Sequence, residues 1–440
     1  MDERFSWVDE FISNVKPYIF VRQEDAVLIK RPNVVQKLNP MGAAILRELL
    51  DGNSISDILG KINHDVEKAD DIYYFLSAVR KSLDDELDVH TLNPAVEKKP
   101  LVAPFTSLPV LSELAVTYRC NFRCSFCYAG INCTRDAAAT ELSTAELKEL
   151  IYKIRFQAQV PSISFTGGEP TLRKDLPELI AYAKEIDMRV NLISNGYLID
   201  EKLAKAMKEA GLDSAQLSLE GATEETHDVV VGVKGAYQQL LKAVKHLEAE
   251  DIRVHTNTTL SLENVDEAVR LPGFLKELGM ARFSMNLVIP TGSAKEHEKI
   301  LLPYSRAGEI VTKIYEESKR QDIEFMWYSP LPLCMFNTIT AGLGNKGCAA
   351  CDGLLSVDPE GNIIPCASWD EPMGNLLNND FESIWHTDRS TQIRNKMETH
   401  PLCRECDSFH SCQGACPLYW NMNGYGELDK IFEKNKELMH

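Results

Sequence analysis

Three cysteines in the stretch YRCNFRCSFCYAG are spaced so that they can do chemistry together. Cys120, Cys124 and Cys127 form a CxxxCxxC loop. Three thiolates this close can bind three irons of a cubane iron–sulfur cluster, which leaves the fourth iron without a protein ligand. An open iron is a place where a substrate or a cofactor binds. The alternative is a zinc knuckle or a set of buried free thiols, but zinc takes a fourth protein ligand and most often uses CxxC pairs.

A second group of cysteines lies toward the C-terminus. Its members are Cys348, Cys351, Cys366, Cys403, Cys406, Cys412 and Cys416. The last four fall within the fourteen residues CRECDSFHSCQGAC. Clustering of this kind indicates metal binding, and a zinc-binding tail is one interpretation. Cys334, in PLPLCMFN, is a ligand, a substrate-facing acid or a packed residue, whereas Cys133 has no partner at a useful spacing and is expected to be a buried or incidental thiol.

The composition limits the partners and the location of the protein. The chain has 440 residues, of which 44% are hydrophobic, so it can bury at least one large core and form two or three domains. Its formal charge of -18 repels phosphate backbones, so we expect no nucleic-acid partner. The start MDERFSWVDEF does not resemble a secretory signal, and no stretch approaches the roughly 18 apolar residues of a membrane span. We therefore expect a cytoplasmic protein with no membrane partner, in surroundings that favour metal binding over disulfides.

Short β-rich runs alternate with amphipathic helical stretches between residues 110 and 325. The runs are SELAVTY, SISFTGG, MRVNLISNG, SAQLSLEG, RVHTNTTL and RFSMNLVIPTG. Six such units predict an α/β fold in which a parallel sheet curls into a partial (β/α)6 TIM-type barrel. Active sites of these barrels lie at the carboxyl ends of the strands. Residues 167–169 follow the second run, residues 194–196 the third and Glu220 the fourth, so we expect them near the cysteine loop.

Residues 1–88 predict a winged-helix-like α+β domain. The strand-like runs YIFVRQ, AVLIKR and NVVQKLN precede three helical stretches, the last from about Ala69 to Leu83. Gly52 is expected to end the first helix and Ser54 to cap the second. The apolar stripe of the first helix is expected at Met41, Ala44, Ile45, Leu49 and Leu50.

Two further regions complete the expected organisation. Residues 89–109 contain four prolines without sustained periodicity and predict a linker. From residue 326 to residue 440 the strand–helix alternation stops, and cysteines, glycines and prolines dominate. This composition predicts a cysteine-rich C-terminal domain.

The cysteine loop resembles the radical S-adenosylmethionine (radical SAM) superfamily, because Phe126 stands beside its last cysteine and FTGGEP follows at the second strand. The resemblance implies that S-adenosylmethionine chelates the open iron of a [4Fe–4S] cluster through its methionyl amine and carboxylate. An electron from the cluster then produces a 5'-deoxyadenosyl radical, which abstracts a hydrogen atom from the substrate. Oxygen sensitivity is expected for an open-iron cluster.

The resemblance also assigns contacts to S-adenosylmethionine. Gly167, Gly168 and Glu169 would hold the methionyl amine, and Phe126 would lie near the adenine. Ser194, Asn195 and Ser218 are candidates for ribose or carboxylate contacts. For Ser194 and Asn195 the alternative is a simple turn before Gly196.

The stretch after the fourth run extends the resemblance. Glu220, His227, Asp228 and Gly232 match a pattern found in relatives with auxiliary clusters. Val231 stands where many relatives have arginine, which puts the salt bridge of that arginine in doubt. His227 is more typical of a capping or core histidine than of a catalytic acid, so the catalytic residues stay unassigned.

The cysteines after residue 348 resemble the SPASM extension, which binds auxiliary iron–sulfur clusters. By this resemblance Cys348, Cys351, Cys366 and Cys416 would bind a first auxiliary [4Fe–4S] cluster. Cys403, Cys406 and Cys412 would bind a second. Relatives usually have one more cysteine downstream, and this chain has none there. The fourth position would be open, or filled by Asp429, His410, a carboxylate near Glu433, or Cys334.

The N-terminal region resembles the RiPP recognition element, a PqqD-like peptide-recognition domain, through its strand and helix order and the stretch LNPMGAAILRELLDG. In that family a leader peptide adds a strand to the third β-strand and lies against the third helix. The corresponding edge here is Val34 to Leu38, facing a helix with Tyr73, Phe75 and Val79. The alternative is an ordinary winged-helix-like domain used for packing or dimerisation.

Together these resemblances imply an enzyme that modifies a ribosomally synthesised peptide by radical hydrogen abstraction, for example to form a crosslink. The precursor peptide would bind the N-terminal domain, and a flavodoxin or ferredoxin would donate electrons. One alternative is a related enzyme that acts on a protein side chain or on a small molecule, such as a tetrapyrrole or cofactor precursor. Another is a non-enzymatic iron–sulfur electron carrier or scaffold.

Overall fold

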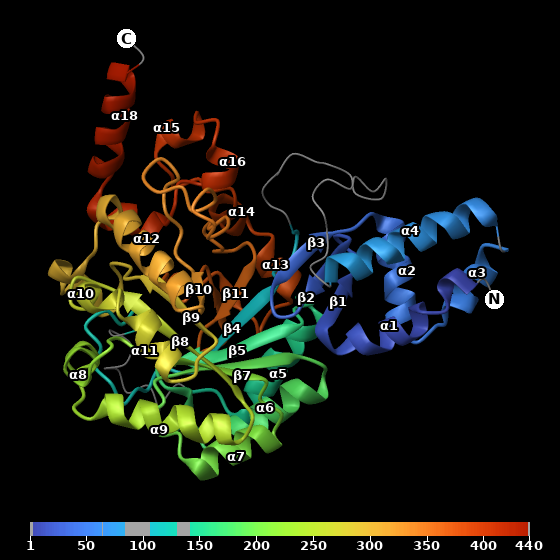
Figure 1. Ribbon diagram of the computed structural model, residues 1–440, viewed down its shortest axis with the longest axis horizontal. Helices are drawn as coiled ribbons and strands as arrows, with labels where there is room; N and C mark the ends of the chain where they lie inside the picture. The colour runs from blue at the N-terminus through green and yellow to red at the C-terminus, as the bar shows by residue number, and fades with distance from the viewer. Residues whose placement is uncertain (1–2, 64, 84–105, 130–140, 439–440) are drawn as a thin grey trace. The chain divides into compact units, whose positions relative to one another are not determined.

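The computed structural model describes residues 3–63, 65–83, 106–129 and 141–438, which belong to two compact units, Met1–Leu111 and Ser112–His440 (Figure 1). No helix among these residues is long and apolar enough to cross a membrane. Cys133 and most of the predicted linker lie outside the described residues. The end of that linker packs within the N-terminal unit, because the guanidinium of Arg22 donates to the carbonyl oxygens of Leu108 (3.0 Å) and Pro109 (2.7 Å).

The N-terminal unit has the expected order of three strands followed by three helices. Its antiparallel sheet has the order β1-β2-β3, with β1 at Ile19–Arg22, β2 at Val27–Lys30 and β3 at Val34–Lys37. The helices after the sheet are α2 (Pro40–Leu50), α3 (Ile55–Lys61) and α4 (Val66–Leu83). The helix α1 (Val8–Val15) precedes the sheet and was not predicted.

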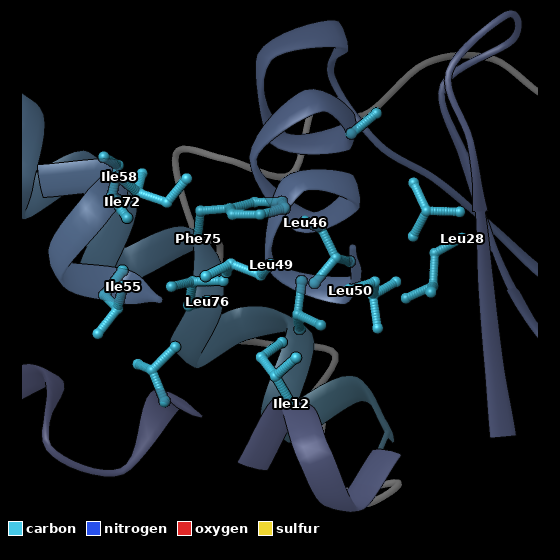
Figure 2. Close-up of a cluster of buried hydrophobic side chains, with 14 of the residues drawn as sticks. Ile12, Leu28, Leu46, Leu49, Leu50, Ile55, Ile58, Ile72, Phe75 and Leu76 are labelled. Carbon is cyan, nitrogen blue, oxygen red and sulfur yellow. The ribbon is translucent and has the colours of Figure 1, made fainter. Parts of the chain in front are cut away.

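The core of this unit is formed where the helices meet one another and the sheet (Figure 2). Its members include Ile12, Leu28, Leu46, Leu49, Leu50, Ile55, Ile58, Ile72, Phe75 and Leu76. The predicted stripe of α2 is wrong at Met41, which is 71% exposed. The helix begins at Pro40 after Asn39, whose side chain accepts the N–H of Gly42 at 2.6 Å. This start places Ala43 and Leu46 on the buried face instead. Ser54 caps α3 as predicted, in a capping box with Asp57.

The C-terminal unit contains the predicted partial barrel. The six expected strands are parallel neighbours in sequence order, and they are β4 (Leu111–Thr117), β5 (Ser162–Gly167), β6 (Arg189–Ser194), β7 (Ser214–Ser218), β8 (Arg253–Leu260) and β9 (Arg282–Leu287). The helices that follow them are α5 (Thr144–Phe156), α6 (Leu176–Glu185), α7 (Glu201–Glu209), α8 (Glu224–Val231), α9 (Ala236–Ala249), α10 (Val265–Ala268), α11 (Leu271–Glu277) and α12 (Tyr304–Arg320). A seventh parallel strand, β10 (Glu324–Trp327), pairs with β9. The expected boundary between residues 325 and 326 therefore falls inside a barrel strand.

The two faces of the barrel strands differ in polarity. One face carries fully buried apolar residues such as Phe165 and Leu217, as strands covered by helices require (Figure 1). The other face, which is the barrel interior, carries polar side chains that bond from strand to strand. These pairs are Asn191 with Ser164 and Ser214, Gln216 with His255, and Asn257 with Ser284 and Asn286. Barrel interiors usually hold branched apolar side chains, so this interior is suited to a polar ligand.

The cysteine-rich region extends the same sheet. Strand β11 (Leu354–Val357) lies beside β4, followed by β12 (Asn362–Ile364) and β13 (Gly374–Asn375). Its helices are α13 (Phe381–Trp385), α14 (Asp388–Arg394), α15 (Pro401–Arg404), α16 (Phe409–Cys412), α17 (Pro417–Asn423) and α18 (Gly426–Leu438). Tyr304 of α12 stacks on Tyr419 of α17 with ring centroids 3.7 Å apart, and Lys153 of α5 donates to the carbonyl of Leu376 at 2.8 Å. These contacts join the region to the barrel.

Candidate active site and cysteine clusters

The loop with Cys120, Cys124 and Cys127 follows β4 and is tied to the end of α8. The backbone N–H of Arg123 donates to the carbonyl of Val231 at 3.1 Å, and that of Ser125 donates to the carbonyl of Val230 at 3.2 Å. Gly232 ends α8 in the left-handed conformation, with φ of +68°, and a Cβ there would lie 3.0 Å from the carbonyl oxygen of Arg123. Glycine at this position therefore lets the cysteine loop approach the helix.

The cysteine loop has a second attachment and an apolar lining. The carbonyl of Cys127 accepts the N–H of Ser293, after β9, at 2.9 Å. Cys120 and Cys124 pack against a small apolar cluster that includes the buried side chains of Phe122 and Val231. Val231 therefore supplies an apolar wall beside the cysteines, where an arginine would have supplied a charge. Phe126 packs against a separate apolar cluster with Val288 and Ile300.

The backbone of Gly167 and Gly168 packs against the backbone just before the cysteine loop. The N–H of Gly168 donates to the carbonyl of Thr117 at 2.7 Å, and the N–H of Glu169 donates to the carbonyl of Arg119 at 2.8 Å. A Cβ on Gly167 would meet the Thr117 oxygen at 2.1 Å, and one on Gly168 would meet the Arg119 oxygen at 2.3 Å. Only glycine allows this close approach of two backbones. The sequence prediction that these residues lie next to the cysteine loop is met.

Glu169 is fully buried at the same place. Burial raises the pKa of its carboxyl group, while hydrogen bonds from Thr171, Asn195 and Ser194 act in the opposite direction. The Ser194 hydroxyl donates to Oε1 at 2.8 Å, and the N–H of Asn195 donates to Oε2 at 2.8 Å. Ser194 Oγ also accepts the N–H of Gly196 at 3.0 Å, as in the predicted turn. In this structure Ser194 therefore positions Glu169 and closes the turn.

Asn195 connects Glu169 to the cysteine loop by hydrogen bonds. Its Nδ2 donates to Oδ1 of Asn121, the residue after Cys120, at 2.8 Å. The Nδ2 group of Asn121 is buried and has no hydrogen-bond partner among the residues that the structure describes. A buried donor without a partner is costly, so its presence points to a ligand acceptor beside Cys120. The sequence analysis missed Asn121, because nothing in its type or spacing marks it.

Three residues after β7 that match the pattern of relatives with auxiliary clusters have structural roles. They are Glu220, His227 and Asp228. His227 is fully buried, and its Nδ1 accepts the N–H of Glu220 at 3.1 Å. Burial lowers the pKa of His227 to about 4, so its ring is neutral. Asp228 caps α9 by accepting the N–H of Tyr237 at 2.9 Å. Burial raises the pKa of Glu220 to about 8, and its Oε2 accepts the N–H of Thr259 at 2.8 Å. The expectation that His227 is a capping or core histidine is confirmed.

A small cavity lies beside the neighbouring strands β5, β4, β11 and β12, and it is partly open to solvent. Glu113, Tyr118, Tyr128, Thr166, Ser356, Val357, Ile364 and Ala367 line it. Burial raises the pKa of Glu113 to about 7. A carboxyl group with that pKa can accept or donate a proton near neutral pH. The sequence analysis missed Glu113, because its burial depends on the later strands β11 and β12.

The first predicted group of C-terminal cysteines is brought together. Cys348, Cys351 and Cys366 share an apolar cluster with Trp369. Burial raises the pKa of Cys416 to about 12, and the nearby thiol of Cys348 raises it further. Among the described residues, no three cysteine, histidine or acidic side chains are placed to hold a single metal ion. The four thiols are nevertheless neighbours, although three of them come from a segment far from Cys416.

Cationic groups stand beside this first group. Lys396 Nζ donates to the carbonyl of Cys348 at 2.6 Å, and Arg394 Nε donates to the carbonyl of Cys351 at 2.8 Å. These charges lower the pKa of the Cys351 thiol, although burial has the larger effect and raises it to about 12. Nearby cations favour the thiolate form that binds metal.

Comparison with known proteins decides the family. The model of the radical SAM superfamily matches residues 114–287, and that of the SPASM iron–sulfur cluster-binding domain matches residues 348–407. The Fe-coproporphyrin III synthase of Methanosarcina barkeri (strain Fusaro / DSM 804) is 30% identical over 380 residues, which cover 75% of this chain and 86% of that protein. The chain belongs to the radical SAM superfamily. It is an enzyme of the radical SAM/SPASM type, with S-adenosylmethionine, a [4Fe–4S] cluster and auxiliary iron–sulfur clusters as cofactors.

Other radical SAM proteins resemble this chain over different lengths. The PqqA peptide cyclase of Granulibacter bethesdensis (strain ATCC BAA-1260 / CGDNIH1) is 27% identical over 317 residues, which cover 70% of this chain and 81% of that protein. The crystal structure of Streptococcus suis SuiB bound to precursor peptide SuiA has a TM-score of 0.70 at 17% identity. That match covers 93% of this chain and 96% of SuiB, and it shows a common fold.

Proposed function

We propose that this radical SAM enzyme modifies a ribosomally synthesised precursor peptide by hydrogen abstraction. The observation that carries the proposal is the extent of the likeness to SuiB. It covers 93% of the chain, and the remaining 7% is far shorter than the N-terminal unit Met1–Leu111, so most of that unit is included. SuiB has been solved with its precursor peptide. A likeness that includes the N-terminal unit supports a peptide as the substrate.

The edge of β3 supports a peptide-binding role for the N-terminal unit. Leu38 donates its N–H to the carbonyl of Ala26, so the alternate residues Gln36 and Val34 also face β2. The N–H and C=O groups of Val35 and Lys37 then face away from β2. No strand among the described residues pairs with this side of β3. An incoming peptide strand can use these groups by β-augmentation.

The surface of α4 differs in part from the expectation for a peptide groove. The peptide edge was expected to face a helix containing Tyr73, Phe75 and Val79, but Phe75 and Val79 are buried in the core of the unit and Tyr73 packs against that core. Tyr74 of α4 is 57% exposed and Val34 of β3 is 54% exposed. Exposed apolar and aromatic side chains of this kind are suited to contact a leader peptide.

The cofactor assignments fit the structure and stay part of the proposal. Cys120, Cys124 and Cys127 would bind the [4Fe–4S] cluster, which supplies the electron for cleavage of S-adenosylmethionine when both are bound. The methionyl amine donates hydrogen bonds, so carbonyl groups of residues 167–169 and the Glu169 carboxylate would accept them. Asn121 Nδ2 would donate to an acceptor of the cofactor. Phe126, Ser218 and Asn195 remain the candidates for adenine, ribose and carboxylate contacts.

The electron and proton routes complete the proposal. The thiols of Cys348, Cys351, Cys366 and Cys416 would bind the first auxiliary cluster, which would accept the electron left after a crosslink forms or bind the substrate. Glu113 lines the small cavity beside β4, β5, β11 and β12, and its carboxyl group would take part in proton exchange during the reaction. A flavodoxin or ferredoxin would reduce the radical-forming cluster.

The test uses short peptides encoded beside this gene. The full-length reconstituted enzyme is incubated anaerobically with S-adenosylmethionine, reductant and each candidate precursor. We expect one peptide to bind with micromolar affinity, to raise the yield of 5'-deoxyadenosine and to change in mass by lost hydrogens. Formation of 5'-deoxyadenosine without modification of any such peptide would contradict the peptide proposal while leaving the enzyme class intact.

A tetrapyrrole substrate is the second candidate function. The 30% identity to Fe-coproporphyrin III synthase favours it. The same assay with iron coproporphyrin in place of peptide selects between the two substrates.

A further inference from the structure

The second group of C-terminal cysteines has three obvious members. Cys403 lies on α15, Cys412 ends α16, and Cys406 lies between these helices. A cubane cluster held entirely by protein takes four thiolates. The sequence leaves the fourth ligand open between Cys334 and several groups that are not cysteines. Contacts in this part of the structure distinguish these possibilities.

Cys334 lies in a tight turn after β10. The N–H of Met335 and the N–H of Phe336 both donate to the carbonyl of Pro332, at 2.9 and 3.0 Å. The preceding residue, Leu333, donates its N–H to Sγ of Cys412 at 3.3 Å, although the two residues are 79 positions apart. Hydrogen bonds from backbone N–H groups to cysteine sulfur stabilise the thiolate form and tune iron–sulfur clusters. The turn therefore places Cys334 beside Cys412.

The electrostatic neighbours of these thiols agree with that placement. Burial raises the pKa of Cys403 to about 12, and the thiols of Cys412, Cys334 and Cys406 raise it as well. Burial also raises the pKa of Cys334 to about 11, with Cys412 and Cys406 as the charged neighbours. Cys403 and Cys334 therefore share Cys412 and Cys406 as neighbouring thiols, and Cys334 is itself a neighbour of Cys403.

The groups that compete for the fourth position are engaged or exposed. Asp429 Oδ1 lies 3.3 Å from Nε2 of His400, and its side chain is 55% exposed. His400 is held in turn, because its Nδ1 accepts the N–H of Leu402 at 3.1 Å. His410 and Glu433 are exposed, as Cys334 and Cys406 are, so exposure does not decide between them. The thiols that act on Cys403 are those of Cys412, Cys334 and Cys406.

We propose that Cys334 is the fourth protein ligand of the second auxiliary cluster. The cluster then has four thiolate ligands, so none of its irons is open to a substrate. Its role is electron transfer and a covalent tie between the turn after β10 and helices α15 and α16. The inference does not depend on the identity of the substrate, because it concerns only the ligand set.

Iron analysis of the full-length protein, reconstituted anaerobically, tests the ligand set. Cys334→Ala should lower the iron content by about one to four atoms per chain, as one cluster converts to a three-iron form or is lost. Cys412→Ala should cause the same loss, and the double variant should lose no more than Cys412→Ala alone. Asp429→Asn and His410→Ala should keep the wild-type iron content. Unchanged iron in Cys334→Ala, or a loss in Asp429→Asn or His410→Ala, would overturn the assignment.

A conservative variant distinguishes the loss of a cluster ligand from misfolding of the protein. Serine can replace the thiolate with an oxygen ligand, so Cys334→Ser should fold and keep three clusters. Its Mössbauer and EPR spectra should change for one cluster and match wild type for the other two. Spectra identical to wild type for all clusters would contradict the proposal. None of these measurements requires a peptide, so a failure here is distinct from a failure of the proposed function.

Discussion

At the scale of single residues, Glu169 carries the sharpest prediction for cofactor binding. Its carboxylate is fully buried beside the two glycines under the cysteine loop. Glu169→Gln keeps the shape but removes the negative charge that a methionyl ammonium would meet. A hydrogen bond to a charged group contributes about 1.5–3 kcal/mol, so we expect binding of S-adenosylmethionine to weaken at least about tenfold. The measurement is the dissociation constant on reconstituted protein. Glu178→Gln, an exposed carboxylate on α6, should have no effect, and equal affinity in both variants would contradict the assignment.

Glu220 predicts a pH dependence of stability. Burial raises its pKa from 4.5 to about 8, so the folded protein holds this proton more tightly than the unfolded chain does. The free energy of unfolding therefore falls as the pH rises through that window, by roughly 5 kcal/mol at most, and levels off above it. Glu220→Gln stays neutral and should show a flatter thermal midpoint between pH 6 and pH 9. Glu225→Gln, an exposed carboxylate on the following helix α8, serves as control. Parallel profiles for wild type and Glu220→Gln would refute the interpretation.

Residues with distinctive types and spacing could be predicted from the sequence, and residues defined by their surroundings could not. The cysteine loop, Gly167, Gly168 and Glu169 were recognisable because their types and spacing match the motifs of a known family, and the close backbone approach requires glycine at residues 167 and 168. Asn121 and Glu113 were missed, since an unpartnered amide or a raised pKa depends on segments distant in the chain. Cys334 is an intermediate case. The sequence did not decide whether it is a ligand, whereas the hydrogen bond from Leu333 to Cys412 places it beside a predicted ligand.

At the scale of elements, the outer edge of β3 carries a prediction for peptide binding. The N–H of Val35 faces away from β2, so Val35→Pro removes one donor for an incoming strand and keeps the hydrogen bonds to β2. Proline would also hinder close approach of the peptide backbone. We expect binding of the precursor to weaken about tenfold or more, since one such bond is worth about 1 kcal/mol before steric effects. Fluorescence anisotropy with labelled leader peptide measures this. An unchanged affinity would place the peptide elsewhere.

Elements with clear periodicity were the predictable ones. The six barrel strands stood out because short apolar runs alternate with amphipathic helices. Strand β10 was missed, because it is only four residues long and precedes a cysteine-rich segment without a following helix of the same kind. Helix α1 was also missed, although Val8, Phe11, Ile12 and Val15 have helical spacing.

At the scale of the whole molecule, the two compact units predict that peptide recognition and radical chemistry can be separated by mutation. Val35 lies in Met1–Leu111, and Cys124 lies in Ser112–His440. Cys124→Ala removes a ligand of the radical-forming cluster, so 5'-deoxyadenosine formation should fall to background. Its affinity for the leader peptide should stay within about twofold of wild type, because the β3 edge is untouched. Val35→Pro should show the opposite pattern, with weak peptide binding and wild-type cleavage of S-adenosylmethionine in the absence of peptide. Loss of both properties in either variant would mean that the units do not act independently.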